Sequence, residues 1–421
     1  MRYLLLPNKI TGLNTHLRIM PGGSTMSTDT IEETDIVIGS KEWMYYTKTI
    51  GQEVPSLLPE AQKKALQTVL NLEEKNKIIP LSNILPPDEL ASCIFSFCMK
   101  AGILLRDESP IYFDKYFRHE LKFLDELVPA YIDEDKFAAY SLEDQQGLVK
   151  TFTPDRNGFA KKVVYDHFKS PTGRLVVSDG PHILTINKKY RDMISSSYGE
   201  KGKILCVDYV SLEPAVLLND SVNVHSNWLS STRDTSIQNS QDIYAQVAEI
   251  LFVNNLLNER ITRDDAKAIV LRTIYGAQED LIGQILQGKN SVPLHDFLFE
   301  VRELFGINNL LQCLRSERKL SNGDFIWNSY QRAIPTTGVE DYKLVNYYVQ
   351  SSAVDVALLG FKQIVDSLKW HEVRPLFVLH DALFLDVHES ALEVFAACVE
   401  EGKGVPNYLD QPFSLKVSVL T

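Results

Sequence analysis

The sequence predicts an α+β fold in which an antiparallel sheet carries helices on one face and is interrupted by a helical insertion. The first observation is an apolar strand pattern, "KILCVDYV", at 203–210. The second is "RPLFVLHDALFLDVH" at 374–388, the pattern of a strand, a tight turn and a returning strand. Third, the segments between these two have helical spacing of apolar residues.

The amino-terminal 150 residues divide into two parts with different sequence patterns. Residues 1–50 mix short apolar runs with Gly, Ser and Thr, which predicts strands and loops. The run Tyr3–Leu6 is too short for a signal peptide and predicts a first strand. Helical spacing then predicts helices over 59–76, 88–105 and 112–132. No chemical motif stands out in this block, and its charged residues are expected at the surface.

After residue 150 the predicted elements alternate between strands and helices. Their order is a strand at 158–168, a turn at 170–174, the strand at 203–210, helices at 240–252 and 262–276, a long amphipathic helix at 346–368, the hairpin, a helix at 390–402 and a strand at 413–420. Thr262 is the expected N-cap of the helix that follows it.

The composition is that of a globular protein long enough for two or more domains or subdomains. No apolar run approaches the roughly 18 residues of a membrane span. The five scattered cysteines favour free thiols in a reducing cytoplasm over a zinc site.

The charge of the chain bears on its partners. A net charge of −12 argues mildly against a nucleic-acid partner. The basic segment 161–174, "KKVVYDHFKSPTGR", is either a solvated loop or a phosphate contact.

Two aspartates end the two strand patterns. Asp208 follows the apolar run of the first, and Asp381 lies at the turn of the second. A carboxylate beside a buried strand is costly unless it is paired or binds a cation. If the two strands are neighbours, the carboxylates suit Mg²⁺ and two-metal phosphoryl transfer. The alternative is that each caps a turn or pairs with an arginine.

One helix carries a stripe of functional side chains. Arg263, Lys267, Leu271 and Tyr275 are spaced by four residues and share one side of the helix. Two cations one turn apart, then an apolar residue and an aromatic ring, can hold a triphosphate at one end and a base at the other. A surface helix with incidental charges is the alternative. Gly276 suits a helix end or the close approach of another segment.

Together these segments resemble motifs A, B and C of the DNA polymerase I family (family A DNA polymerases). Motif A, D-Y-S-Q-I-E, resembles "DYVSLE" at 208–213, and motif C, H-D-E, resembles His380-Asp381-Ala382. Motif B, R-x3-K-x7-Y-G, is matched without a gap by the helix at 262–276. "SPTGRL", "DIYAQVAEILF" and "NYYVQSSAVDVAL" resemble flanking segments of the family. The similarity spans about residues 150 to 421.

The resemblance implies a right-hand polymerase fold with an antiparallel palm sheet, helical fingers and a helical thumb. The implied division is 1–80 of unclear role, 81–164 thumb-like, 165–230 first part of the palm with motif A, 231–340 fingers with motif B, and 341–421 second part of the palm with motif C. No D-x-E on a strand marks the amino-terminal block as a 3′–5′ exonuclease, so no proofreading activity is expected in this chain.

The resemblance also implies residue roles. Asp208 and Asp381, helped by the Tyr209 carbonyl, would hold two Mg²⁺ ions, with Mn²⁺ as a substitute. Arg263 and Lys267 would grip the triphosphate, and Lys267 could also protonate pyrophosphate. The other implied nucleotide-binding residues are Tyr209, Tyr244, Leu271, Tyr275, which would lie under the templating pair, and Glu213, which would block a ribose 2′-hydroxyl. Primer–template contacts are implied for Arg174, Asn346, Gln350 and His380.

Several positions depart from the family pattern. Ala382 replaces the auxiliary glutamate of motif C, which is expected to lower the rate or primer handling without preventing catalysis. Leu271 stands where the family has Phe or Tyr, at a position that affects discrimination at the sugar 3′ position. Ser211 and Pro214 replace the usual residues around motif A, and Tyr244 replaces a histidine.

The expected function is that of a template-directed DNA polymerase from a phage or other mobile element, working in the bacterial host cytoplasm. The expected partners are primer–template DNA, dNTPs and a separate exonuclease or processivity subunit. One alternative is a catalytically degenerate subunit that binds primer–template or scaffolds a replication complex. Another is a specialised translesion or primer-making nucleotidyltransferase.

Overall fold

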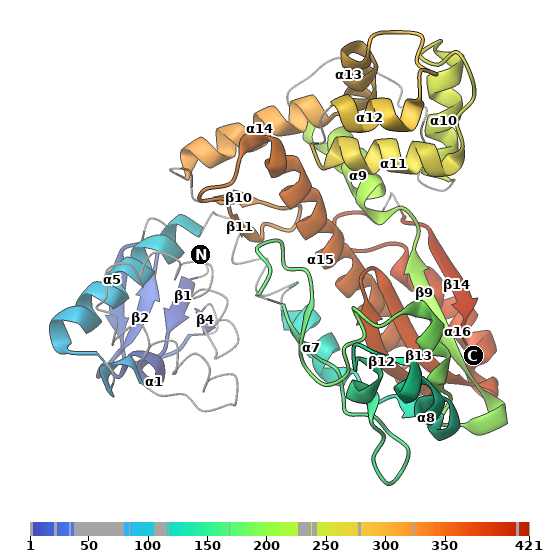
Figure 1. Cartoon of the computed structure of the whole chain (residues 1–421). Coiled ribbons are helices and arrows are strands. Elements are labelled where there is room, and N and C mark those ends of the chain that lie inside the picture. Colours follow the sequence, from blue (N-terminus) through green and yellow to red (C-terminus); the bar gives the residue numbers. More distant parts are fainter. Residues whose placement is uncertain are drawn as a thin grey trace. The chain divides into compact units, whose positions relative to one another are not determined.

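A computed structural model describes most of the chain, in two compact units. The described residues are 3–20, 23–32, 35–37, 80–83, 85–104, 116, 118–167, 169–225, 237, 242–276, 279–321, 323, 325–409 and 412–420. The first unit comprises Met1–Arg118 with Gln331–Pro335, and the second comprises His119–Tyr330 with Thr336–Thr421. Each unit is described by itself (Figure 1).

The first unit contains a small sheet and a long helix. Its elements are β1 (Tyr3–Leu6), α1 (Asn8–Thr11), β2 (His16–Ile19), β3 (Thr25–Thr28), β4 (Asp35–Val37), η1 (Leu81–Asn83), α5 (Pro87–Leu104) and β11 (Ala333–Pro335). The sheet order is β3-β2-β1-β4, with β4 parallel to β1. The predicted strand Tyr3–Leu6 and the helix at 88–105 are confirmed. The helix predicted over 59–76 lies outside the described residues.

A four-stranded antiparallel sheet is the centre of the second unit. Its strands are β9 (Gly202–Tyr209), β12 (Val373–Leu379), β13 (Ala382–His388) and β14 (Leu415–Val419), in the order β12-β13-β9-β14. The two strand patterns that end in aspartates therefore become neighbours, because β13 pairs with β9 along its whole length. This confirms the predicted hairpin and the predicted antiparallel sheet.

The long helix α15 (Leu344–Ser367) packs against one face of this sheet. The Phe361 ring lies 5.4 Å from the ring of Tyr209, which points from β9 toward the helix. Gly360 permits this approach, because a Cβ at that position would lie 1.8 Å from the Tyr209 hydroxyl. Among the described residues, no helix is long and apolar enough to cross a membrane.

The other face of the sheet is also covered, which differs from the prediction of helices on one face only. Phe377 and Phe384 stack at 4.8 Å on this side, and Ala382 belongs to the same buried cluster. The covering segment, 130–194, contributes residues such as Phe152 and Met193. Its elements are β5 (Tyr131–Ile132), α8 (Glu134–Glu143), η3 (Val149–Phe152), β6 (Val164–Asp166), β7 (Val176–Asp179), η4 (Lys188–Met193) and β8 (Ile194–Ser195).

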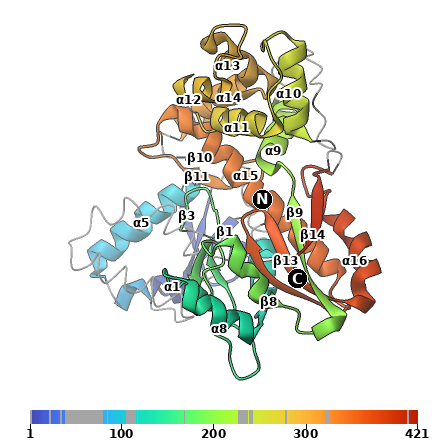
Figure 2. The same cartoon turned by 45° about the vertical axis from the view of Figure 1, so that its right-hand side comes forward.

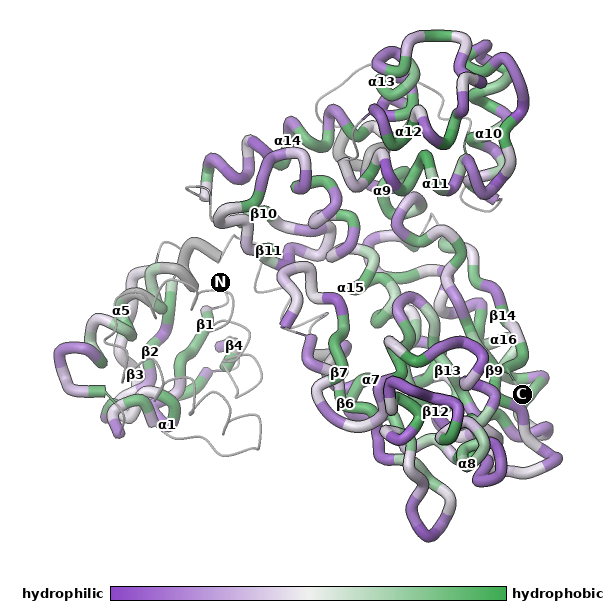
Figure 3. Tube along the Cα trace, viewed as in Figure 1, coloured by the Kyte–Doolittle hydropathy of each residue, from purple (hydrophilic) through white to green (hydrophobic). Residues whose placement is uncertain are grey.

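The helical insertion follows β9 and gathers its helices at the top of Figures 1 and 2. Its elements are α9 (Leu212–His225), α10 (Ile243–Val253), α11 (Arg263–Ile274), α12 (Glu279–Leu286), α13 (Leu294–Leu304) and α14 (Ile307–Leu320). Hydrophobic and hydrophilic residues alternate along α14 (Figure 3), whose buried side carries Ile307, Leu310 and Leu314. The remaining elements of the unit are η5 (Gly199–Lys201), β10 (Phe325–Trp327), η6 (Asp341–Lys343), η7 (Glu389–Ala391), α16 (Leu392–Val399) and η8 (Glu400–Gly402).

Two predicted elements are shorter in the structure. The helix predicted over 112–132 is described as α7 (Arg118–Glu126), and Pro129 disfavours its continuation. The Val128 amide donates to the Pro375 carbonyl at 2.8 Å instead. The strand predicted over 158–168 is reduced to β6, Val164–Asp166, because its earlier part turns at Gly158 and forms only an isolated bridge from Phe159 to Tyr131.

Candidate active site

Strand pairing brings the two predicted catalytic aspartates to one end of the sheet. Asp208 lies directly opposite Ala382 in the ladder between β9 and β13. Asp381 precedes Ala382 in the hairpin turn, and its carbonyl accepts a hydrogen bond of 3.1 Å from the Tyr209 amide. The backbone of each aspartate is thereby fixed against the backbone of the other strand. Residues 173 positions apart (381 − 208) form one local group.

The hairpin turn that carries Asp381 has a strained backbone. His380 and Asp381 are its two central residues, and His380 has φ +57°. The left-handed region costs a non-glycine residue energy and persists only where surrounding structure enforces it. Here the flanking strands β12 and β13 enforce it over a buried ladder from Phe377 to Phe384. The turn therefore holds Asp381 at the end of the sheet with little freedom.

A lysine completes a row of three side chains across the sheet. Lys416 of β14 lies opposite Asp208 on the side away from Ala382. Directly paired residues in an antiparallel sheet project from the same face. The order across that face is thus a methyl group, a carboxylate and an ammonium group. Sequence reasoning missed Lys416. Its signal was one basic residue in the apolar final strand "FSLKVSVL".

Burial raises the proton affinity of both aspartates, and the charge of Asp381 adds to this effect at Asp208. Loss of hydration raises the pKa of Asp208 to about 6, and the charge of Asp381 adds to this rise. Lys416 and Lys267 act in the opposite direction and lower it. Burial likewise raises the pKa of Asp381, with a smaller contribution from the charge of Glu213. Such a pair favours a bound cation, which removes the repulsion.

A cavity of about 800 Å³ opens in front of the aspartates. All of the predicted site residues line it except Asn346: Arg174, Asp208, Tyr209, Glu213, Tyr244, Arg263, Lys267, Leu271, Tyr275, Gln350, His380 and Asp381. Asn346 is connected to it indirectly, because Gln350 donates to the Asn346 side-chain oxygen at 2.5 Å. The cavity lies wholly within the second unit.

Tyr209 contributes to the cavity differently from its neighbours. Its ring is buried between Phe361 and Phe413, and its hydroxyl donates to the Gly402 carbonyl. The ring therefore takes part in the core of the sheet and helix layers. What Tyr209 can offer a ligand in the cavity is its backbone, as the predicted metal-binding carbonyl requires.

The helix α11 is held at both ends by local interactions. Thr262 is its N-cap, as predicted, and it also forms a capping box with Asp265. Tyr275 is the C-cap, and Gly276 follows with φ +75°. A Cβ at Gly276 would lie 2.7 Å from the ring of Tyr342, so both expected reasons for this glycine apply. The stripe of cations therefore has a fixed direction.

Arg263 and Lys267 are organised by residues of the neighbouring helix α10. The Arg263 Nε donates to Asp242 Oδ2 at 2.5 Å, and Asp242 also caps α10 through the amides of Tyr244 and Ala245. The Tyr244 ring lies 5.3 Å from the Arg263 guanidinium and 5.9 Å from the Lys267 ammonium. Burial raises the pKa of Tyr244. Asp242 is a second residue that sequence reasoning missed.

Glu213 joins two segments at the mouth of the cavity. Arg174 Nη2 donates to its Oε1 at 2.6 Å, and the Tyr275 hydroxyl donates to its Oε2 at 2.6 Å. Burial and the charge of Glu213 raise the pKa of Tyr275, so its hydroxyl remains a donor. Both carboxylate oxygens are occupied. The glutamate side chain is therefore fixed in position in the first turn of α9 rather than mobile in solvent.

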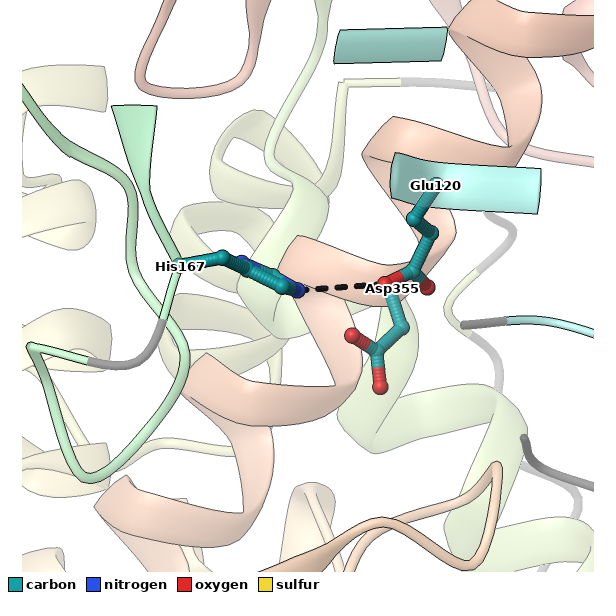
Figure 4. A group of neighbouring side chains, drawn as sticks. All are labelled: Glu120, His167 and Asp355. Carbon is teal, nitrogen blue, oxygen red and sulfur yellow. Dashed lines mark hydrogen bonds and ion pairs between the residues drawn. The ribbon is translucent and has the colours of Figure 1, made fainter. Parts of the chain in front are cut away.

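A third feature that the sequence did not reveal lies away from this cavity. Glu120, His167 and Asp355 offer ligand atoms that all lie within 4.8 Å of one another (Figure 4). All three side chains are buried. They come from α7, the segment after β6, and α15, so no spacing within the sequence connects them.

Comparisons with known proteins find similarity in structure but not in sequence. No protein-family model and no curated protein matches the sequence. Among solved structures, the fold is similar to the polymerase domain of Pol1 from M. smegmatis, determined in complex with DNA primer–template and dNTP. The TM-score is 0.58 and the sequence identity is 12%, and the match covers 99% of this chain and 95% of that chain. The likeness is one of fold.

Proposed function

We propose that this chain is a template-directed DNA polymerase that adds deoxynucleotides to a primer 3′ end and releases pyrophosphate. The observation that supports this most is the cavity in which Asp208 and Asp381 lie together with Arg263 and Lys267. A pair of carboxylates and a pair of cations match the two parts of a nucleotide that reacts at its α-phosphate. The polymerase-domain neighbour, which contains primer–template and dNTP, supports the same reading.

The donor set at the end of the sheet fits Mg²⁺. Asp208 and Asp381 supply carboxylate oxygens, the Tyr209 backbone supplies a carbonyl, and the aspartates repel one another when both are charged. These three residues would hold the ions. When bound, Mg²⁺ supplies the positive charge that favours ionisation of a primer 3′-hydroxyl and offsets charge on the phosphates.

Arg263 and Lys267 bind the triphosphate in this proposal. Asp242 keeps the guanidinium in one orientation, and the Tyr244 ring beneath both cations restricts their movement. Cations that are already placed lose less entropy when they bind an anion. Lys267 can also give a proton to the departing pyrophosphate. Tyr244 thus contributes mainly as a platform, with its hydroxyl in the place of the family's histidine.

Glu213 selects the sugar. Its side chain is held by Arg174 and Tyr275 on the cavity wall, which leaves it little room to move away from a ribose 2′-hydroxyl. A fixed carboxylate discriminates by steric exclusion, so deoxynucleotides are favoured. Tyr275 presents its ring, 37% exposed, for stacking under the templating pair, and Leu271 lines the sugar side.

Primer–template contacts fall to Arg174, Asn346, Gln350 and His380. Gln350 reaches the cavity from α15, and Asn346 lies one turn earlier in hydrogen-bond contact with it. His380 is exposed at the turn beside Asp381, where a primer end must come to react. In this arrangement the sheet of β9, β12, β13 and β14 is the palm, and the α10–α14 helices are the fingers.

Single-nucleotide incorporation opposite each of the four template bases tests this function. A polymerase incorporates the complementary deoxynucleotide in each case, whereas a template-independent transferase shows the same preference on all templates.

The second candidate function is a scaffolding subunit. It is favoured by the row in which Ala382 and Lys416 flank Asp208, because that row has one acid where the family has two. Binding of primer–template without incorporation on any template would support the scaffold and contradict the polymerase.

A further inference from the structure

The cluster of Glu120, His167 and Asp355 has the composition of a metal site. Relative exposure is 0% for Glu120, 1% for His167 and 0% for Asp355. His167 Nε2 lies 3.1 Å from Glu120 Oε2, and the three ligand atoms converge on one point from three segments of the chain (Figure 4). None of the three lines the active-site cavity.

Charge makes this cluster unusual. Two carboxylates and one imidazole carry a net charge of at least −1 when the carboxylates are ionised, even with the imidazole protonated. Removing such groups from water is costly unless opposite charge accompanies them. Protons on the acids, a cationic side chain nearby or a metal cation among the three residues would each supply this compensation. A buried histidine between two buried acids is an arrangement that a dication stabilises directly.

We propose that Glu120, His167 and Asp355 bind a structural transition-metal dication of the Zn²⁺ type. Carboxylate oxygens and an imidazole nitrogen are ordinary zinc ligands, and the imidazole favours zinc over magnesium. Ligands at about 2.0–2.2 Å from a tetrahedral ion lie roughly 3.3 Å from one another. The separation of His167 Nε2 and Glu120 Oε2 is already close to that value. A fourth position is taken by water or a neighbouring oxygen.

The surroundings of Asp355 fit a ligand. Asn328 Nδ2 donates to Asp355 Oδ2 at 2.6 Å and to Ser351 Oγ at 3.1 Å. The Asn328 side-chain oxygen in turn accepts from the Tyr330 amide at 2.9 Å. Hydrogen bonds of this kind orient a ligating carboxylate. Asp355 is thereby held toward His167 and Glu120.

Metal binding would connect three segments of the fold to one another. The ion joins α7, the end of β6 and the middle of α15 at one point. Helix α15 also carries Gln350, which reaches the active-site cavity. A metal at Asp355 therefore fixes the helix that supports one wall of that cavity. The site does not depend on the proposed polymerase activity, and its tests need no turnover.

Metal content of the full-length chain tests the proposal. The measurement uses a background carrying Asp208→Ala and Asp381→Ala, so that ions at the sheet cannot contribute. After exhaustive dialysis against metal-free buffer and reloading with Zn²⁺, about one equivalent of zinc per chain is expected by mass spectrometry. Excess Mg²⁺ is expected not to displace it, and chelation is expected to lower the melting temperature. Co²⁺ in place of zinc is expected to give visible bands of a low-symmetry site.

Two nearly isosteric variants and one surface control sharpen the test. Asp355→Asn keeps an acceptor for Asn328 but lacks the charge, and Glu120→Gln does the same at the second acid. Both are expected to lose the zinc and the chelator effect, whereas His182→Gln, at an exposed histidine, keeps both. Absence of stoichiometric zinc in the parent chain would overturn the proposal. So would a melting temperature that is unchanged by chelator and raised by Asp355→Asn, the result expected if protons neutralise the cluster.

Discussion

Ala382 lies directly opposite Asp208 in the ladder that joins β13 to β9, and Lys416 lies opposite the same aspartate on β14. The position where the DNA polymerase I family has its auxiliary glutamate is therefore next to Asp208, one of the two proposed metal ligands, in space as well as next to Asp381 in sequence. The absence of an acid at residue 382 and the presence of Lys416 both make this end of the sheet less negative. Metal affinity should reflect both changes.

Restoring the glutamate should strengthen metal binding. Ala382→Glu places a third carboxylate beside Asp208, so the Mg²⁺ concentration for half-maximal primer extension should fall roughly three- to tenfold. Without metal the added repulsion should lower the melting temperature. Ala382→Gln has the same size without the charge and controls for crowding at this buried position. An unchanged Mg²⁺ requirement in Ala382→Glu, with normal folding, would place residue 382 outside the metal site.

Removing the positive charge of Lys416 should change the pH dependence of the Mg²⁺ requirement. Because the pKa of Asp208 is raised to about 6, its protonated form predominates below that pH, and a proton then competes with Mg²⁺. The half-saturating Mg²⁺ concentration should therefore rise by up to about tenfold per pH unit below 6.

Lys416→Gln should shift this acid limb to higher pH, since Lys416 lowers the pKa of Asp208. At pH 8 the same variant should need less Mg²⁺, because a repelling charge is gone. Lys203→Gln, at an exposed lysine of the same strand β9, is the matched control and should change neither value. Coincident pH profiles for the native chain and Lys416→Gln would show that Lys416 does not act on Asp208.

Asp242 is predicted to position Arg263 for the triphosphate. Asp242→Asn retains an N-cap for α10 but removes the charge that holds the guanidinium. The expected result is an increase of about three- to tenfold in KM for dNTP, a smaller change in kcat and little change in melting temperature. Glu249→Gln removes the exposed partner of Arg260 from the same helix and should leave KM unchanged. A lower melting temperature with an unchanged KM would show that Asp242 acts only as the N-cap of α10.

Glu213 is predicted to govern sugar selection. Glu213→Ala removes the side chain that Arg174 and Tyr275 hold at the cavity wall. The ratio of kcat/KM for a deoxynucleotide to that for the matching ribonucleotide should fall by about tenfold or more. Tyr275→Phe removes one of the two hydrogen bonds and should give a smaller loss. Equal ratios in the native chain, Glu213→Ala and Tyr275→Phe would show that Glu213 does not discriminate between the two sugars.

The elements with strong patterns could be read from the sequence. The strand 203–210, the hairpin and the long helix α15 combine clear apolar periodicity with clear ends, and the structure contains each of them. The helix over 112–132 was too long because the pattern continued past the point where Pro129 and pairing with Pro375 end it. Local spacing does not report such tertiary interactions.

The site could be predicted as far as residues lie within recognisable motifs. Asp208, Asp381 and Lys267 fall into this group, and the structure brings all three to one cavity. Lys416 could not be found in this way, because it acts through a partner on a different strand. Asp242 begins the family-like segment "DIYAQVAEILF", but its ion pair with Arg263 of another helix is visible only in the folded chain. The cluster around His167 depends on three distant segments, so only the folded chain brings it together.

Primer extension with Mg²⁺ and dNTPs, comparing the native chain with Asp208→Ala and Asp381→Ala, tests the central claim most directly. The native chain should extend a primer along the template. Each variant should lose at least about a thousandfold in rate, because each lacks one of the two carboxylates of the metal site. Binding of primer–template should persist in both variants. Full activity in Asp381→Ala, or no extension by the native chain across a range of salt and metal, would contradict the account.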